Sequence, residues 1–278
     1  MIELNHLTKT FETFTAVDSL NLRIESGEFF GLLGPNGAGK TTTIGMLSTL
    51  LLPTRGEILI DGERLTRKRK DIKRKVSVIT QEYSMRQDMD MDEIMEYQGR
   101  LYFMPVRRIR SRTEELFRFA GLTEHRHKTI RKLSGGMKRK LMVCRALLTE
   151  PEILLLDEPT AGMDAISRRQ MWNLLRQLNE QGLTILLTTH YIEEAQALCQ
   201  RVALMNGGRL GDVDTPKHLI DRLGAWAVDK QRADGIRSRY FSERSQAISY
   251  LSGLQETSAL RDTTLEDVFV EQAGKSLT

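Results

Sequence analysis

The chain has 278 residues, and 41 lysine and arginine side chains against 37 acidic ones give it a formal charge of +4. Hydrophobic residues make up 40% and charged residues 28%, proportions that exclude a disordered or low-complexity protein. No apolar run reaches about eighteen residues, so we expect no transmembrane helix. Two cysteines are too few for a disulfide scaffold, and the N-terminus lacks an apolar signal peptide. A cytosolic protein is therefore expected.

The first eighty residues are rich in strand patterns. Alternating apolar residues predict a strand, a turn and a second strand within residues 2–24. Two further strands are predicted at Phe29–Leu33 and Gly56–Ile60, with a helix-forming segment, Thr41–Leu51, between them. The short β-branched run Val76–Ile79 predicts a buried strand.

The middle of the chain has first a helical pattern and then alternating strands and helices. From about 85 to 150, methionine, leucine and charged residues at helical spacing predict a helical subdomain. Two apolar runs follow, Ile153–Asp157 and Thr184–Thr188, separated by a helical segment, Ile166–Gln181. Apolar strands that alternate with helices indicate an α/β fold with a parallel sheet buried on both faces.

The last part is predicted to be a small unit of its own. Thr215 and Pro216 begin a short capped helix, and Thr264–Asp267 forms a capping box at the start of another. We expect a main domain over 1–215 and a C-terminal extension over 216–278.

The loop after the third strand matches G-x-x-x-x-G-K-[ST] at each constrained position. Glycines let successive backbone N–H groups turn toward a polyanion, and the following helix directs its positive end to the same point. Lys40 would reach the phosphates and Thr41 would bind Mg²⁺. The alternative is a glycine-rich turn that matches by chance. The residues assigned to nucleotide binding here are Gly34, Pro35, Asn36, Gly37, Ala38, Gly39, Lys40, Thr41 and Thr42.

Two adjacent carboxylates, Asp157 and Glu158, end the apolar strand at 153–157. Asp157 would bind the metal, and Glu158 would orient and deprotonate an attacking water. The alternative is an acidic turn at the end of a strand. Beside a phosphate loop, the magnesium and general-base assignment is favoured.

A second anion-binding helix start lies far from the first. Ser134, Gly135 and Gly136 precede the helix-forming run Lys138–Leu148, where Ser134 can cap the helix and the glycines expose backbone N–H groups. One triphosphate needs one cradle, so two cradles imply either two ligands or one ligand shared between subunits.

Taken together, these motifs resemble the ATP-binding cassette (ABC) ATPases. The resemblance rests on GPNGAGKTT, Gln81, LSGGM, ILLLDEP, the turn Ala161–Asp164 and His190, in family order. It covers about residues 1–210. It implies a P-loop ATPase core with an antiparallel β-subdomain, a helical subdomain and a small α+β C-terminal extension. It also implies ATP and Mg²⁺ as ligands.

The resemblance implies a head-to-tail homodimer, or a heterodimer with a similar ATPase. ATP would lie between the phosphate loop of one subunit and Ser134, Gly135 and Gly136 of the other, and Asp164 would bridge the subunits. Met137 and Ala165 depart from the usual Gln and Pro. Contacts from Met137 to the opposite ribose are therefore in question, but no phosphate contact is removed.

Three further roles follow from the same resemblance. Phe11 would stack on adenine, Gln81 would contact Mg²⁺ and the water, and His190 would contact the γ-phosphate. The alternatives are a core residue for Phe11, a surface amide for Gln81 and a structural histidine for His190. Positions at strand ends favour the functional assignment for Gln81 and His190.

The leading hypothesis for function is export driven by ATP. LLGPNGAGKTT and the segment Thr264–Phe269 resemble the ATPases of ABC-2 type exporters of drugs, lipids, polysaccharides and nodulation factors. The expected partner is a separate multi-span permease that docks near 85–110. This places the chain in the cytoplasm, at the inner face of the membrane.

A non-transport ABC ATPase acting on nucleic acid or ribosomes is the alternative. The run Arg67–Lys75, with seven basic residues in nine, is its best support, although such a run is more often a solvated face. Nucleic acid is not expected as a partner, because the chain has neither a second cassette nor a long coiled coil. An ATP-binding scaffold without turnover is disfavoured by Glu158 and His190.

Overall fold

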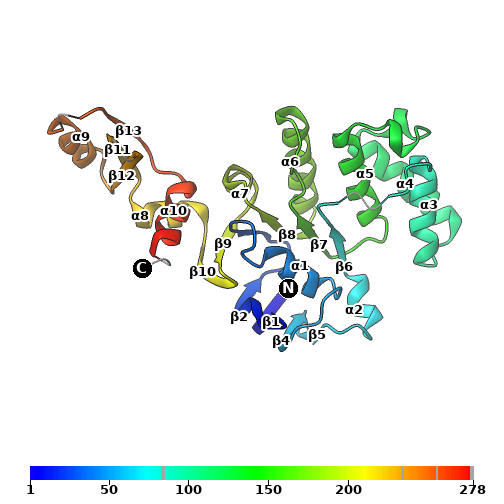
Figure 1. Ribbon diagram of the computed structural model, residues 1–278. Helices are drawn as coiled ribbons and strands as arrows, with labels where there is room; N and C mark the ends of the chain where they lie inside the picture. Colours follow the sequence, from blue (N-terminus) through cyan, green and yellow to red (C-terminus); the bar gives the residue numbers. More distant parts are fainter. Residues whose placement is uncertain (83–84, 233–234, 255, 276–278) are drawn as a thin grey trace.

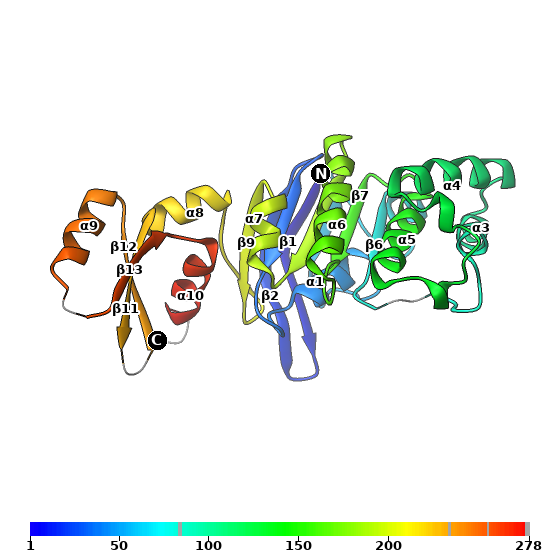
Figure 2. The ribbon, with the colours of Figure 1, turned by 90° about the horizontal axis from the view of Figure 1, so that it is seen from above.

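The computed structural model describes residues 1–82, 85–232, 235–254 and 256–275. A sheet-based core lies in the middle, with a helical subdomain on one side and the C-terminal unit on the other (Figures 1 and 2). Within the described residues, no helix has the length and apolar character needed to span a membrane.

The central sheet has six strands in the order β10-β9-β3-β8-β7-β6. All are parallel except the edge strand β10. Its strands are β3 (Phe29–Leu33), β6 (Val76–Ile79), β7 (Ile153–Asp157), β8 (Thr184–Thr189), β9 (Arg201–Asn206) and β10 (Arg209–Asp214). Alternate residues of β3 enter two different cores, Phe29 with Leu33 and Phe30 with Leu32. The predicted parallel sheet buried on both faces is confirmed.

An antiparallel sheet covers one of these cores. It has the order β2-β1-β4-β5, with strands β1 (Ile2–Phe11), β2 (Phe14–Ile24), β4 (Arg55–Ile60) and β5 (Glu63–Arg64). Between it and the central sheet lies α1 (Lys40–Leu47). The helix predicted over Thr41–Leu51 is too long. The chain leaves the helix at Ser48, and Thr49 adopts a left-handed φ of 61°.

The helical subdomain joins β6 to β7. Its elements are α3 (Met91–Leu101), α4 (Val106–Ala120), the short η1 (Thr123–His125) and η2 (Ile130–Lys132), and α5 (Gly135–Leu147). The first of these helices, α3, begins at 91 and not at 85. A capping box formed by Asp90 and Glu93 marks its start. A short helix, α2 (Lys70–Arg74), precedes β6, while α6 (Ala165–Glu180) and α7 (Ile192–Leu198) flank β8.

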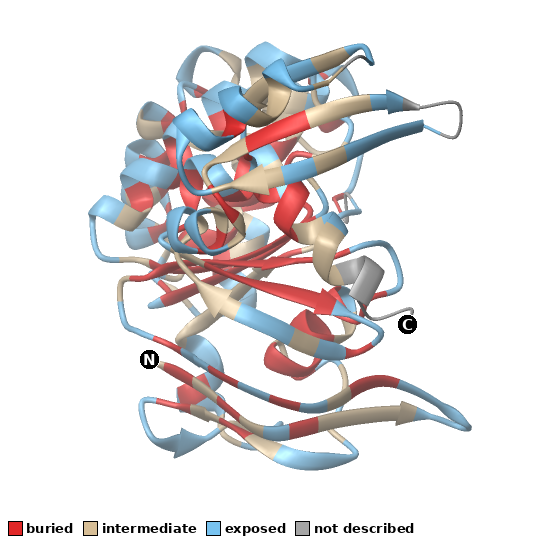
Figure 3. Cartoon of the chain, turned by 90° about the vertical axis from the view of Figure 1, so that its left-hand side faces the viewer, coloured by how far each residue is buried: buried red, intermediate tan, exposed pale blue. Residues whose placement is uncertain are grey.

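The C-terminal unit, defined here as the described residues from α8 onward, has its own sheet in the order β12-β11-β13. Its elements are α8 (Pro216–Leu223), β11 (Trp226–Arg232), β12 (Gly235–Phe241), α9 (Arg244–Ser252), β13 (Ser258–Asp262) and α10 (Leu265–Lys275). Only α8 and α10 are predicted above. The edge strand β12 is exposed over much of its length (Figure 3), so its sequence lacks the alternation of a half-buried strand.

Two helices connect the C-terminal unit to the core. Leu219 of α8 and Leu265 and Val268 of α10 are buried in the same cluster as Ala195 and Leu198 of α7. The boundary at 215 stays a prediction, since the apolar core continues across it.

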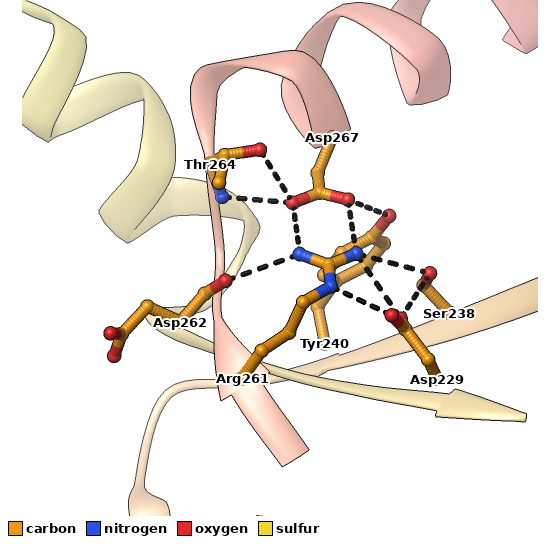
Figure 4. Close-up of polar contacts among 7 residues, drawn as sticks. All are labelled: Asp229, Ser238, Tyr240, Arg261, Asp262, Thr264 and Asp267. Atoms are coloured by element: carbon orange, nitrogen blue, oxygen red, sulfur yellow. Dashed lines mark hydrogen bonds and ion pairs between the residues drawn. The ribbon is translucent and has the colours of Figure 1, made fainter. Parts of the chain in front are cut away.

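Arg261 organises the face of the small sheet that packs against the start of α10 (Figure 4). Its guanidinium donates to Asp229 Oδ2 at 2.7 Å and to Asp267 Oδ2 at 2.7 Å. Asp267 also accepts the N–H of Thr264 at 2.8 Å, so the predicted capping contact at the start of α10 is present. Burial alone would raise the pKa of Asp267, but Arg261 and Thr264 outweigh it and lower the pKa to about 2.

Replacing Arg261 by methionine is expected to lower the free energy of unfolding of the C-terminal unit by about 1–3 kcal/mol, because two carboxylates lose their charged partner. In the wild type, the contribution of Asp267 is complete above about pH 4, the unfolded pKa, and is lost as pH falls toward 2. Hydrogen exchange of β11–β13 measures both effects. Arg239→Met is the control, since Arg239 contacts Phe241 and Tyr250 rather than the carboxylates of Asp229 and Asp267. Equal losses in the two variants would contradict the prediction.

Candidate active site

A cleft of ≈ 560 Å³ lies at the carboxyl ends of the central strands. The phosphate loop follows β3, Gln81 follows β6, Glu158 follows β7 and His190 follows β8. The sequence-predicted residues that line the cleft are Phe11, Asn36, Gly37, Gly39, Lys40, Thr41, Thr42, Gln81, Glu158 and His190. The neighbouring Gly34, Pro35, Ala38 and Asp157 do not line it.

The conformation of the phosphate loop requires glycine. Gly37 and Gly39 have φ of 82° and 107°, in the region that other residues rarely adopt. A Cβ at Gly39 would also lie 2.5 Å from the carbonyl oxygen of Ala16, and one at Gly34 would collide with the carbonyl oxygen of Met205. Because α1 begins at Lys40, its free N–H groups face the loop.

Lys40 is buried beneath this loop. Its Nζ donates to the carbonyl oxygens of Gly34 at 2.8 Å and Pro35 at 3.0 Å, and lies 3.9 Å from Glu158 Oε1. Burial lowers the pKa of Lys40, and the carboxylates of Glu158 and Asp157 oppose this change. The ammonium group is therefore held at the base of the loop by carbonyl oxygens that a phosphate could replace.

Asp157 joins the phosphate loop to the neighbouring strands. Its Oδ1 accepts a hydrogen bond from Thr41 Oγ1 at 3.2 Å and from Thr188 Oγ1 at 2.6 Å. Hydroxyl and carboxylate oxygens are the donors that Mg²⁺ prefers. Thr41 and Asp157 would provide two such oxygens. That fits a magnesium ion held mainly by phosphates and water.

Glu158 and His190 form a close pair at the edge of the cleft. Glu158 Oε1 lies 3.0 Å from His190 Nδ1, and the His190 ring packs against that of Tyr191, with centroids 4.1 Å apart and an interplanar angle of 37°. Glu158 adopts a left-handed φ of 49°, a conformation that costs a non-glycine residue about 1 kcal/mol or more. Its N–H donates to the carbonyl oxygen of Thr188 at 3.0 Å. The strained turn thus places the carboxylate beside the histidine.

Two phenylalanines of the β1–β2 hairpin also line the cleft. Phe11 and Phe14 face each other across the β1–β2 hairpin and are 42% and 63% exposed. The core alternative for Phe11 therefore does not fit. Phe14, three residues after Phe11, and Tyr191, next to His190, also line the cleft and were not predicted from the sequence.

The second cradle lies outside this cleft. Ser134 caps α5 by accepting the N–H of Met137 at 3.2 Å, and Asp164 caps α6 by accepting the N–H of Ser167 at 2.9 Å. A Cβ at Gly136 would lie 3.1 Å from Ser167 Oγ, so the two caps are neighbours. None of Ser134, Gly135, Gly136 and Asp164 lines the cleft. The predicted residues therefore form two separate groups within one chain.

Comparisons of the sequence with a family model and with individual proteins agree with one another. A family model described as ABC transporter matches residues 17–161. The Nod factor export ATP-binding protein I of Cupriavidus metallidurans is 38% identical over 298 residues, covering 100% of this chain and 98% of that protein. The daunorubicin/doxorubicin resistance ATP-binding protein DrrA of Streptomyces peucetius is 38% identical and covers 87% of this chain and 73% of its own length.

Solved structures give the same result for the fold. The dimeric, post-hydrolysis ATP-binding cassette MJ0796 with bound ADP and Pi is 28% identical, with a TM-score of 0.70 over 77% of this chain and 98% of that one. An ATP-binding subunit of an ABC transporter has a TM-score of 0.74 over 98% of this chain and 99% of its own, at 23% identity. The expected α/β P-loop architecture is confirmed.

Replacing Lys40 by alanine is expected to weaken binding of ATP and ADP by about ten- to a hundredfold, the size of a charge-assisted contact. Binding of adenosine should not change, because it has no phosphate. Isothermal titration of the three ligands tests this, with Lys217→Ala in α8 as the control. Unchanged ATP affinity in Lys40→Ala would remove the phosphate-loop assignment.

Proposed function

This chain belongs to the ABC transporter family of ATP-binding proteins, and we propose that it works as a nucleotide-clamping dimer that drives export through a separate permease. As a member of this family it binds and hydrolyses ATP. The observation that carries the proposal is the separation of its two anion-binding groups, one within the cleft and one outside it.

The nucleotide would bind with its phosphates on the loop and its base on the aromatic residues. Loop N–H groups would surround the phosphates, and Lys40 would exchange its bonds to Gly34 and Pro35 for phosphate oxygens. Phe11 and Phe14 line the same cleft and are exposed, which suits them to stacking on adenine.

A magnesium ion would be held by Thr41, with Asp157 and Gln81 contributing directly or through water. It would neutralise charge on the β- and γ-phosphates. Thr188 fixes Asp157 by a 2.6 Å hydrogen bond, and Gln81 lines the same cleft from the end of β6.

Glu158 would be the general base for the attacking water. Its carboxylate is buried at the cleft and is paired with His190 at 3.0 Å, so its orientation is fixed before the nucleotide binds. His190 would also contact the γ-phosphate. Water activation by a positioned carboxylate is worth about a hundredfold or more in rate.

A second copy, or a similar ATPase, would supply the missing contacts. Ser134, Gly135 and Gly136 present a capped helix start away from the cleft of their own chain, next to Asp164. In a head-to-tail dimer this surface would close over the phosphates of the other subunit. Met137 is held in the first turn of α5 by Ser134, so the departure from Gln does not disturb the cap.

The groove between α2, β6 and the helical subdomain fits a permease segment. It measures ≈ 540 Å³ and contains Lys70, Lys73 and Arg74 next to Leu101 and Tyr102. Its described lining includes no carboxylate. We infer that a segment of the membrane permease docks in this groove. That segment would carry both apolar and acidic side chains.

Part of the basic run at 67–75 is engaged by contacts within the chain. Arg67 donates to the carbonyl oxygens of Thr49 and Leu50, Arg69 pairs with Asp71, and Lys75 pairs with Asp61. Three of its seven cations are thus engaged within the chain, and three others line the groove. These contacts favour the transport hypothesis over the nucleic-acid alternative.

Glu158→Gln is expected to keep ATP affinity, lower hydrolysis by about a hundredfold or more, and make the ATP-bound dimer persist. The amide keeps the shape of the side chain but cannot accept the proton. Phosphate release and light scattering with ATP and Mg²⁺ measure the two effects. Glu180→Gln on the surface of α6 is the control. Normal turnover in Glu158→Gln would show that another group is the base.

Reversing two groove charges, as in Lys70→Glu/Lys73→Glu, is expected to reduce co-purification of the permease by about tenfold or more, because like charges would meet at the interface. Basal ATP hydrolysis should remain. Arg118→Glu/Lys217→Glu makes the same charge change on exposed residues outside both the groove and the segment 85–110. If both pairs reduce co-purification equally, the effect is one of net charge, and the groove is not the docking site.

A further inference from the structure

A fully buried carboxylate lies behind the active site. Glu194, in α7, is 0% exposed and does not line the nucleotide cleft. No part of the chemistry described above uses it. A buried carboxylate is unfavourable unless hydrogen bonds compensate for lost hydration, so the partners of Glu194 indicate why it is there.

Those partners come from two different segments. Glu194 Oε1 accepts a hydrogen bond from Thr160 Oγ1 at 2.8 Å and from Trp172 Nε1 at 3.1 Å. Thr160 is two residues beyond Glu158, in the turn that follows β7, and Trp172 lies in α6. The carboxylate therefore fastens the turn that carries Glu158 to the helix behind it.

Glu194 is also close to the segment that carries His190. It is four residues beyond His190, in the first turn of α7, and the Thr189 hydroxyl neighbours its carboxyl group. Tyr191 stacks on His190 and lies beneath Arg168 of α6, whose guanidinium is 5.6 Å from the ring. The same carboxylate thus fixes both sides of the Glu158–His190 pair.

The second carboxyl oxygen of Glu194, Oε2, indicates that this position needs a hydrogen-bond acceptor rather than a negative charge. Glu194 Oε2 has no hydrogen-bond partner in the described part of the chain. Burial raises the pKa of Glu194, while the Thr160, Thr189 and Trp172 donors oppose that rise. One carboxyl oxygen, Oε1, makes both of the hydrogen bonds described above. An amide in the same place would keep that acceptor.

We propose that Glu194 is a positioning residue for hydrolysis, which holds the Glu158 turn against the His190 segment through Thr160 and Trp172. This inference rests on the proposed role of Glu158 as the base. If that role is correct, the 3.0 Å contact between Glu158 and His190 depends on a carboxylate that touches neither of them.

The test compares Glu194→Ala with Glu194→Gln in steady-state ATP hydrolysis. Glu194→Ala is expected to lower kcat by about ten- to a hundredfold, the cost of misplacing a catalytic group, with KM for ATP within about threefold. Glu194→Gln keeps the acceptor and is expected to keep kcat within about threefold. Equal loss in both variants, or no loss in Glu194→Ala, would overturn the proposal.

Two further variants separate positioning from stability. Leu198→Ala removes buried apolar volume from the same helix and is expected to lower the melting temperature without changing kcat. Trp172→Phe removes one donor to Oε1 and is expected to lower kcat by about three- to tenfold, and it gives an answer even if Glu194→Ala does not fold. If kcat falls as much in Leu198→Ala as in Glu194→Ala, the effect is structural and the inference fails.

The Glu158→Gln background distinguishes this inference from the proposed function. With the base already removed, adding Glu194→Ala should lower hydrolysis by less than about threefold, because Glu194 acts through Glu158. If the two effects multiply, Glu194 acts by another route and the inference is wrong. If Glu158→Gln alone leaves turnover unchanged, it is the proposed function that fails.

Discussion

The parallel register of three central strands is the constraint on which the active site depends. Leu33 of β3 pairs with Thr189 of β8, and Thr188 of β8 pairs with Asp157 of β7. Because these strands end at the same level, the next residues of each, from the phosphate loop, the Glu158 turn and the His190 segment, emerge together. The 2.6 Å bond from Thr188 to Asp157 directly joins two of these ends.

The sequence predicts the residues whose chemistry depends on local backbone geometry. The phosphate loop, the two carboxylates at the end of β7 and the cap at Ser134 all have local signals, and each lies where its pattern indicates. The residues missed have no such signal. Phe14 is an ordinary strand residue until a hairpin brings it next to Phe11, and Glu194 looks like a surface position of a short helix until α6 covers it.

The same distinction applies to the fold. The strands β3, β6, β7 and β8 of the central sheet are largely apolar, and the sequence predicts them with nearly correct bounds. The C-terminal strands β11 to β13 escaped prediction because their stability comes from contacts made between strands and with α10, such as those of Arg261 with Asp229 and Asp267. Likewise, the charge of the basic run at 67–75 could not be interpreted without knowing which cations find acidic or carbonyl partners nearby.

The left-handed backbone conformation of Glu158 lowers stability, while its carboxylate is the group proposed for activity. Glycine or asparagine would relieve the unfavourable φ of 49°, but either would remove the carboxylate. A screen that selects only for thermal stability would therefore enrich catalytically inactive variants at this position. A thermostable form that keeps turnover must gain its stability elsewhere in the chain.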